Sequence, residues 1–455
     1  MKMMSQRIIG LIKKNRRAKE LVKFFLQFVN REPRYFFCSP YHVQAPRIKL
    51  PVQSSGNKLE DIEHGLIKDI SLYRDVISFP LDGGRVKSHK GGITDGKTYT
   101  LIREAIHFNG ELCQEPPELD LSILRDANLP VVKHVVLYGG IMYNNFGHFL
   151  LESLGRIWCY QHVKDLDPYI LFYTYWGDPN YFDRKNYVHQ VLQGFGIPLT
   201  RIIFINKIAR IEKLIVPAQK YGYEFCRKPD GIFMDFIRSF SFPLSVPGGF
   251  EQADHIYVSR ARLSSNLGKL IGENLFEIFL KSCGYVMFYP EQHSIYEQLS
   301  VYGRAKKIIF ADGGALHACI LLPDLQAEIA IISRRRDPKW IPSDIADQFR
   351  GYGKTVLWVD GVKDQYQFGL DTWNAISTID WYAVSETLRE HGFVDGAFTR
   401  FSEMDYNYQV RKDLKQFISQ VQNNPRFVNF MMELKEPESK FVNEALIKDG
   451  VHETQ

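Results

Sequence analysis

The chain has 455 residues, which is too long for one ordinary hydrophobic core, and its 45% hydrophobic and 24% charged residues exclude a globally disordered protein. The net charge of +5 is small for this length, and beyond the N-terminus the basic residues are spread out, so we expect no nucleic-acid partner. The length predicts two globular domains with a further segment at each end.

The N-terminal segment, residues 1–40, is basic and amphipathic. It mixes Lys and Arg with Ile, Leu and Phe, and it lacks the compact apolar run and small-residue cleavage site of a secretory signal. Residues 1–30 could lie on an anionic membrane, or they could pack on the protein with their lysines in solvent. No apolar run reaches the roughly 20 residues that span a bilayer. Because the cysteines are also isolated from one another, we expect a cytoplasmic protein, at most peripheral to the membrane.

From residue 131 onward, β-rich runs alternate with helical patterns. The predicted strands are 131–140, 168–176, 201–205, 255–259, 285–290, 306–312, 328–333 and 355–360, and the predicted helices are 146–164, 186–195, 272–283 and 292–304. Such alternation indicates an α/β protein with parallel sheets covered on both faces. Residues 70–125 predict an irregular β portion instead.

A stretch rich in Pro, Gly and Ser, residues 239–254, predicts a linker between two α/β units. We therefore expect two Rossmann-like domains, 41–245 and 246–377, that face one another across a cleft. A helical tail, 378–455, follows them and is expected to pack partly on the first domain.

The stretch YNNFGHFLLESLGRIW, at 143–158, predicts an amphipathic helix with an unusual polar stripe. His148, Glu152 and Arg156 recur at steps of four, so they share one line along an α-helix. This line could be an ion-paired edge in water, or it could line a catalytic cleft. Because imidazole titrates near neutrality, His148 suits a general base that Glu152 orients. Two alternatives stay open: Glu152 is itself the base, or His148 only caps the helix start.

Two segments of the second domain predict an anion site. Arg260 follows a predicted strand, where ligands of open α/β sheets gather, and a guanidinium there can bind a pyrophosphate. Gly313 and Gly314 follow another strand, at a junction where backbone amides can approach a negative charge. An exposed arginine and a tight turn that binds nothing are the alternatives. RRRD at 334–337 also follows a strand, and we predict solvated loop charge there.

Four segments in this order, NNFGHFLLESLGRIW, IYVSR, YPEQHSIYEQ and ADGGALHA, resemble glycosyltransferase family 61, in particular its bacterial, capsule-associated branch. The resemblance covers roughly residues 130–325. The matching residues are Asn145, Gly147, His148, Phe149, Glu152, Ser259, Arg260, Pro290, Glu291, Ser294, Glu297, Gln298, Gly313, Ala315, Leu316 and His317. Asp312 and Ala318 depart from the family pattern, which commonly has His and Asn there.

The resemblance implies a GT-B fold and an inverting transfer of a sugar from a nucleotide sugar, with a UDP-sugar favoured, to a hydroxyl of a surface or lipid-linked glycan. The second domain would bind the donor through Ser259, Arg260, Glu291, Ser294, Glu297, Gln298, Asp312, Gly313, Gly314, Ala315 and His317. On the first domain, which would bind the acceptor, Asn145 is a further substrate-binding residue, and Arg156 would pair with Glu152 or contact the acceptor. No metal ion or cofactor is expected, since Arg260 and the glycine turn would neutralise the leaving group.

The departures at Asp312 and Ala318 favour a second hypothesis: a catalytically inactive glycan-binding or scaffolding protein of a polysaccharide assembly complex. The matching His148 and Arg260 argue against it. A metal-dependent hydrolase has little support, because the sequence has no HExxH motif and no Cys/His pair at zinc spacing.

Overall fold

The structure, a computed structural model, describes residues 57–63, 67–81, 89–108, 114–117, 129–174, 182, 186–222, 229–336, 340–351, 353–366 and 374–421. The predicted basic segment 1–40, including the predicted membrane-binding residues 1–30, lies outside these ranges. Among the helices of the described portion of the chain, none is long and apolar enough to cross a bilayer.

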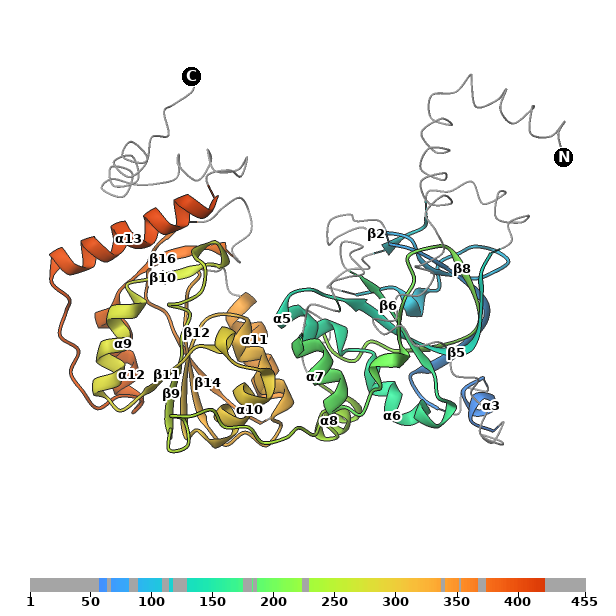
Figure 1. The fold of residues 1–455 in the computed structure, drawn as a ribbon, viewed down its shortest axis with the longest axis horizontal. Coiled ribbons are helices and arrows are strands. Elements are labelled where there is room, and N and C mark those ends of the chain that lie inside the picture. The colour runs from blue at the N-terminus through green and yellow to red at the C-terminus, as the bar shows by residue number, and fades with distance from the viewer. Residues whose placement is uncertain are drawn as a thin grey trace, which may run out of the picture.

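The first unit is built on a mixed sheet with the strand order β3-β1-β8-β5-β6-β7 (Figure 1). Its strands are β1 (Ile70–Phe79), β3 (Gly92–Thr94), β5 (Val131–Met142), β6 (Tyr169–Thr174), β7 (Ile202–Phe204) and β8 (Ala209–Pro217); a separate short pair is β2 (His89–Lys90) with β4 (Gln114–Glu115). β5 to β8 run parallel, whereas β1 runs antiparallel to β3 and β8. The expected Rossmann-like sheet is therefore extended by antiparallel strands; β1 and β3 fall in the predicted irregular β portion, whereas the sequence patterns missed β8.

The second unit contains a parallel sheet with the order β11-β9-β12-β13-β14. Its strands are β9 (His255–Val258), β11 (Val286–Phe288), β12 (Lys307–Ala311), β13 (Glu328–Ile332) and β14 (Val356–Val359). This is the doubly wound order 2-1-3-4-5, whose topological switch point falls between β9 and β12. A small sheet of β10 (Lys269–Ile271), β16 (Ile376–Ile379) and β15 (Val362–Tyr366) completes the unit.

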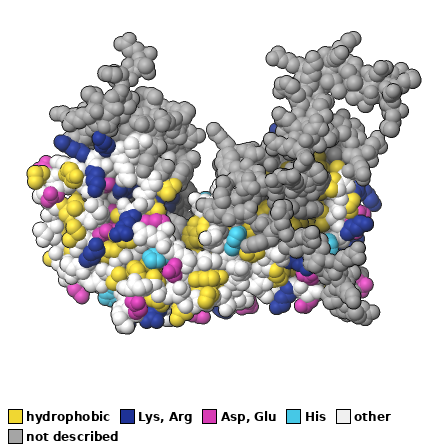
Figure 2. All heavy atoms as spheres, in the orientation of Figure 1, with side chains coloured by type: hydrophobic (Ala, Val, Ile, Leu, Met, Phe, Trp, Pro, Cys, Tyr) yellow, Lys and Arg dark blue, Asp and Glu magenta, His cyan; other side chains and the backbone are white. Residues whose placement is uncertain are grey.

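Helices cover both faces of this parallel sheet, which explains why its strands read as continuous apolar runs. α10 (Ile295–Arg304) and α11 (Trp340–Arg350) lie on the face toward the first unit, and α9 (Glu273–Ser282) and α12 (Trp381–Glu390) lie on the other (Figure 1). Successive residues alternate between the two cores: Ile308 and Phe310 of β12 face the first pair of helices, and Ile309 faces the second. On the face of the molecule in Figure 2, both signs of charge occur over the second unit, with no uniformly basic part.

The helices of the first unit are shorter than the sequence predicts. They are α3 (Asn57–Glu63), α5 (Phe146–His148), the π-helical turn η3 (Phe149–Ser153), α6 (Tyr160–Val163), α7 (Asn186–Gly194) and α8 (Gly231–Arg238). The predicted single helix 146–164 is wrong, because the chain turns at Gly155. The Gly155 carbonyl accepts the amide of Lys220 (2.8 Å), and a Cβ on Gly155 would lie 2.3 Å from the Tyr221 carbonyl oxygen.

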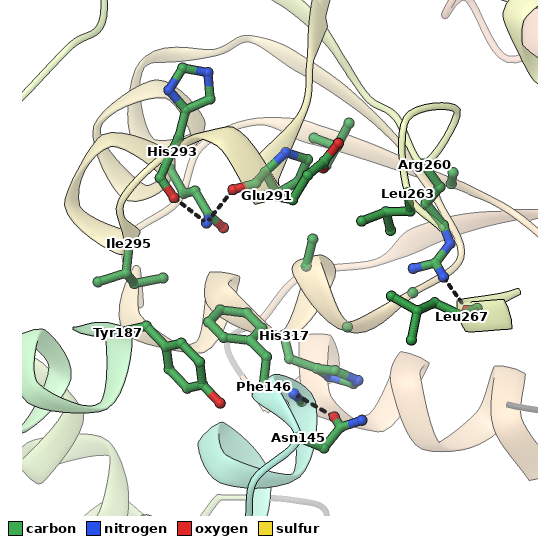
Figure 3. Close-up of a pocket in the computed structure, with 18 of the residues that line it drawn as sticks. Asn145, Phe146, Tyr187, Arg260, Leu263, Leu267, Glu291, His293, Ile295 and His317 are labelled. Atoms are coloured by element: carbon green, nitrogen blue, oxygen red, sulfur yellow. Dashed lines mark hydrogen bonds between the residues drawn. The ribbon is translucent and has the colours of Figure 1, made fainter. Parts of the chain in front are cut away.

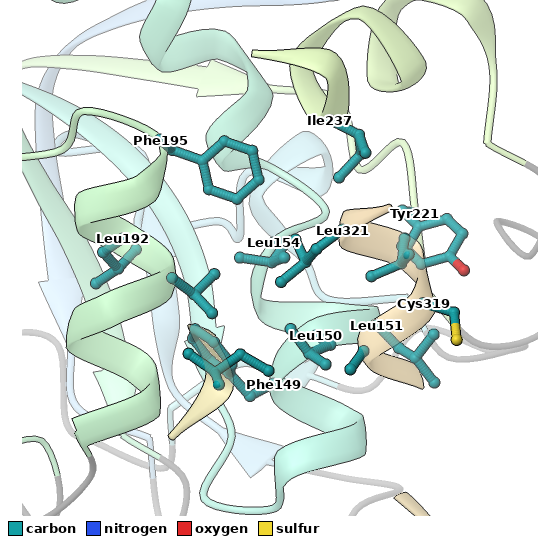
Figure 4. Close-up of a cluster of buried hydrophobic side chains, with 14 of the residues drawn as sticks. Phe149, Leu150, Leu151, Leu154, Leu192, Phe195, Tyr221, Ile237, Cys319 and Leu321 are labelled. Atoms are coloured by element: carbon teal, nitrogen blue, oxygen red, sulfur yellow. The ribbon is translucent and has the colours of Figure 1, made fainter. Parts of the chain in front are cut away.

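One continuous hydrophobic cluster joins the two units. The 3-10 segment η12 (Gly314–Leu321) follows β12 and packs Cys319 and Leu321 against the first unit, beside Leu150 and Leu154 (Figure 4). The predicted linker, residues 239–254, runs between α8 and β9 without helix or strand. The contact through η12 therefore sets how the two sheets face each other.

The described residues of the C-terminal tail pack on the second unit. β16 crosses the predicted boundary at residue 377, and α13 (Glu403–Val421) lies against β10. Asp413 of α13 forms an ion pair with Lys269 (2.8 Å). Its carboxylate also accepts a hydrogen bond from the backbone amide of Gly272 (3.3 Å). Residues 422–455 lie outside the described ranges, so a contact of the tail with the first domain stays a prediction.

Removing the Asp413 carboxylate should destabilise the second unit. The side chains of Lys269 and Asp413 are only 8% and 3% exposed, so Asp413→Ala leaves a buried ammonium without its counter-charge, with only the amide oxygen of Gln416 at 3.3 Å among the described residues. We expect the free energy of unfolding to fall by about 3 to 5 kcal/mol in urea titrations. Lys412→Ala, an exposed change on the same helix, should unfold like the wild type. Equal midpoints for the two variants would show that the ion pair does not hold α13.

Candidate active site

A cavity of about 870 Å³ lies between the two units and is lined by both (Figure 3). The predicted site residues among its lining are Asn145, His148, Arg260, Glu291, Ser294, Gln298, Asp312, Gly313, Gly314, Ala315 and His317. The second unit contributes residues that directly follow β9 and β12, at the switch point of its sheet, where open α/β sheets bind ligands. Four predicted residues, Glu152, Arg156, Ser259 and Glu297, lie behind this wall.

His148 and Glu152 belong to a series of four hydrogen-bonded side chains that runs from the cavity into the first unit. His148 Nδ1 lies 2.5 Å from Glu152 Oε1, so the ring donates its Nδ1 proton to the carboxylate. The other carboxylate oxygen lies 2.9 Å from His107 Nε2, which in turn lies 3.0 Å from the Tyr143 hydroxyl. The His148 side chain is 38% exposed, whereas that of Glu152 is 1% exposed. With Nδ1 bonded to Glu152, the Nε2 of the neutral His148 ring is the nitrogen that carries the lone pair, and Glu152 holds the ring in that tautomer.

Glu152 is kept ionised by its two histidine partners. Burial by itself raises its pKa, but the hydrogen bonds and charges of His107 and His148 outweigh burial and lower the pKa to about 2. His107 was not predicted from the sequence. It stands 41 positions before His148, in the irregular β portion, and only the fold brings it to the carboxylate.

Arg156 is not a substrate contact in this structure, and the prediction for it was wrong. It is 3% exposed, and its guanidinium donates to the carbonyls of Glu104 and Ile106 (2.8 Å each) and of Pro217. The reason is the π-helical turn and the bend at Gly155, which carry position 156 off the line shared by His148 and Glu152.

Arg260 lies over the glycine turn, as expected for an anion site. Its Nη2 donates to the carbonyls of Leu267 (2.6 Å) and Gly268 (3.2 Å), while its Nε is buried with no partner among the described residues. A Cβ on Gly313 would lie 2.1 Å from Arg260 Nη1, so a side chain at this position would displace the guanidinium. Desolvation lowers the pKa of Arg260, which indicates a positive charge that an anionic ligand would stabilise.

The prediction of solvated charge at 334–337 was wrong for Arg334 and Arg335, which line the cavity. Arg334 is 3% exposed, and burial lowers its pKa well below the usual value. Arg335 pairs with Asp312 through two hydrogen bonds of 2.8 Å. Burial raises the pKa of Asp312, but Arg335 outweighs it and the pKa falls to about 2. The sequence did contain a signal for this site: RRRD directly follows a predicted strand, and ligands of open α/β sheets bind at strand ends.

Ser259 is buried rather than ligand-facing, which corrects its predicted role. Its hydroxyl lies within hydrogen-bond distance of Glu277 (2.6 Å) and Glu273 (3.1 Å), and Glu273 also accepts the Tyr257 hydroxyl and the Arg260 amide (2.8 Å each). Desolvation raises the pKa of Glu273 to about 7. This cluster positions the backbone of Arg260 from behind.

Ser294, Glu297 and Gln298 have local structural partners. Ser294 and Glu297 form a capping box at the start of α10. Glu297 is not among the residues that line the cavity, and its substrate contact stays a prediction. Gln298 Nε2 donates to the carbonyls of Pro290 (3.0 Å) and His293 (3.2 Å) and holds the turn that carries Glu291. Asn145 similarly caps α5 through Gly147 N (3.0 Å).

The glycine turn of η12 follows β12 as predicted, but the segment after it is 3-10 rather than α-helical. A second stretch, GGITDGKT at 91–98, matches the phosphate-loop pattern GxxxxGK[ST]. There Asp95 Oδ1 accepts the amides of Lys97 (2.9 Å) and Thr98 (2.7 Å), and the turn returns to pair Thr94 with Leu101 instead of entering a helix. This stretch therefore lacks the geometry of a phosphate loop.

Residues 146–327 match the family model described as Glycosyltransferase 61. The matched region contains lining residues from both units, from α5 to η12, although Arg334 and Arg335 lie beyond it, and the match supports a glycosyltransferase. No curated protein matches the chain. Within the described ranges, no three His, Cys, Asp or Glu side chains gather closely enough to hold a metal ion.

Glu152 should make the protein sensitive to acid. Its pKa in the folded chain, about 2, lies below its ordinary value of 4.5, so the stability it contributes is present above pH 4.5 and is lost as the pH falls toward 2. In urea titrations between pH 5 and 3, the free energy of unfolding of Glu152→Gln should therefore fall less steeply than that of the wild type. Glu403→Gln, which removes an exposed carboxylate, should follow the wild-type slope. Parallel slopes for all three proteins would contradict this role of Glu152.

Proposed function

We propose that the protein is an inverting, metal-independent glycosyltransferase of GT-B type that moves a sugar from a nucleotide sugar to a hydroxyl of a glycan acceptor. The observation that carries the proposal is a cavity to which one unit contributes His148, held from behind by Glu152, and the other contributes Arg260, Arg334 and Arg335. Inverting transfer needs these two functions together: a base for the acceptor hydroxyl and positive charge for the leaving diphosphate.

The guanidinium groups of Arg260, Arg334 and Arg335 support a diphosphate ligand. In the cavity wall they face the carboxylates of Asp312 and Glu291, so three positive charges stand against two negative ones. A nucleoside diphosphate would supply the missing negative charge, and its oxygens could accept from the Arg260 guanidinium, which lines the cavity. Asp312, which departs from the family pattern, is neutralised by Arg335 and gives little ground for an inactive scaffold.

His148 is the better base of the two candidates. Both oxygens of Glu152 are occupied by histidines and its side chain is 1% exposed, so an acceptor cannot reach it. In the proposed step, His148 Nε2 takes the hydroxyl proton while the acceptor oxygen forms a bond to the anomeric carbon. The bond from that carbon to the diphosphate breaks, and its electron pair passes to the phosphate oxygen beside the arginines. Glu152 stabilises the imidazolium that forms.

The finer elements of the proposal rest on the motif resemblance. We propose a UDP-sugar as donor and a capsular, lipopolysaccharide or exopolysaccharide glycan of a bacterium, free or lipid-linked, as acceptor. We also propose a cytoplasmic protein that is peripheral on the membrane through residues 1–30, whose basic amphipathic pattern suits an anionic leaflet.

A ligand panel tests the proposal. Purified protein is heated with UDP-glucose, UDP-galactose, UDP-N-acetylglucosamine, GDP-mannose, UDP and GDP, each with chelator present. A ligand that binds only the folded chain raises the melting temperature. A rise with one nucleotide family is expected, and transfer from that nucleotide sugar to simple glycosides is then assayed. A flat response to every compound would remove the proposed donor site.

His148→Ala should lower transfer by about two to four powers of ten and leave donor affinity nearly unchanged, because it removes the base but none of the arginines. Glu152→Gln should cost less, since the ring remains. Turnover per folded molecule is measured with chelator, with the folded fraction taken from the melting curve. Near wild-type turnover of His148→Ala would exclude His148 as the base.

Arg260→Ala should weaken binding of the nucleoside diphosphate by about 2 to 3 kcal/mol, the scale of a charge-assisted hydrogen-bond pair, and Arg260→Lys should restore only some of this loss. Arg262→Ala is the matched control. Arg262 stands two positions away and stacks on the ring of Tyr289, 3.7 Å from its centroid. Calorimetry that finds equal affinity losses for Arg260→Ala and Arg262→Ala would contradict a phosphate contact at Arg260.

A further inference from the structure

His317 stands where the two units meet. It belongs to η12 of the second unit, and its ring lies so close to Gly147 of the first that a Cβ there would be 2.9 Å from His317 Cδ2. Gly147 directly precedes His148, and Gly313, beneath Arg260, is four positions before His317. Figure 3 shows the His317 ring beside Asn145 and Phe146 at the cavity wall. His317 therefore lies between the base and the arginines.

The second unit holds this ring through one buried amide. Gln348 of α11 is 2% exposed, and its Oε1 lies 2.7 Å from His317 Nδ1. Because an amide oxygen only accepts, the Nδ1 of a neutral ring carries the proton. The remaining nitrogen, Nε2, then has a lone pair and is a hydrogen-bond acceptor. The sequence patterns contain no signal for Gln348, which stands 31 positions after His317.

On the basis of the proposed function, we propose that His317 Nε2 accepts a hydrogen bond from a hydroxyl of the transferred sugar, and that Gln348 is the positioning residue that keeps this nitrogen unprotonated. The reasoning is geometric. The anomeric carbon must lie between the base at His148 and the phosphates at the arginines, and His317 borders that space. The neutral Nε2 can only accept a hydrogen bond, so it suits a sugar hydroxyl, which can donate one. A phosphate oxygen only accepts and would need a donor instead.

The surroundings keep the ring neutral around pH 7. Burial lowers the pKa of His317 to about 4, more than the Gln348 hydrogen bond raises it. The charged or titratable groups that act on it are His148 of α5 and Arg335 after β13, which lower the pKa, and Asp312 after β12, which raises it. The Nε2 of His317 is thus an acceptor around pH 7.

The test changes the partner of the ring rather than the ring. In Gln348→Glu, a carboxylate would raise the pKa of His317, so that Nε2 gains a proton as the pH falls and turns from acceptor into donor. Dissociation constants of the nucleotide sugar from the panel and of its nucleoside diphosphate are measured at pH 8, 7 and 6. The ratio of the two constants is divided by the wild-type ratio at the same pH, which cancels the titration of the diphosphate itself.

We expect Gln348→Glu to lose sugar-dependent affinity by about tenfold between pH 8 and 6, the effect of one unmade hydrogen bond, with little change for the diphosphate alone. Gln348→Met, which removes the amide at similar length, should lose about two- to fourfold at every pH. Asp347→Asn, a change next to Gln348 at a residue that pairs with Arg350 and does not line the cavity, should match the wild type. Melting temperatures check that each variant is folded.

Two results would overturn the inference. A ratio that stays at the wild-type value for Gln348→Glu at all three pH values would mean that Gln348 only fills space. An equal loss for the diphosphate and the nucleotide sugar would mean that His317 contacts phosphate. Failure of the wild type to bind any compound of the panel is a different outcome, because it removes the proposed function itself.

Discussion

The contact between η12 and η3 is the constraint on which the rest of the structure depends. The apolar side chains of Cys319 and Leu321 pack against Leu150 and Leu154, in a core that is continuous between the units. Both segments are the chain immediately beside the site: η3 contains Glu152, and η12 begins at the glycine turn. Because close-packed cores deform little, burying these residues also sets the distance between His148 and the arginines.

The positive charges of the buried arginines at the cavity are only partly balanced by carboxylates. Arg335 has a carboxylate partner in Asp312, whereas Arg260 is held by the carbonyls of Leu267 and Gly268 and has a buried Nε without a partner among the described residues. Carbonyl oxygens position a guanidinium without neutralising it. Such an arrangement costs stability in the empty protein and favours an anionic ligand, which is the condition a diphosphate site requires.

Two histidines near the cavity differ because their partners differ. His148 bonds to a carboxylate, which can stabilise an imidazolium, so it suits a group that takes up a proton. His317 bonds to an amide, which cannot, and burial keeps it neutral. The same side chain can therefore serve as a base at one position and as a fixed acceptor at the other.

Local patterns determined much of the architecture: the alternation of strands and helices, the strand ends at Arg260 and Gly313, and the pairing of His148 with Glu152, which depends only on a spacing of four residues. Tertiary structure decided what depends on partners distant in sequence. Arg156 turns away because the Gly155 carbonyl is taken by Lys220, and His107 and Gln348 reach their partners only through the folding of other segments. Arg335 enters the site because Asp312 on the neighbouring strand needs a counter-charge. Spacing along the chain specifies neighbours one turn away, but the contacts between strands and units arise only when the cores pack.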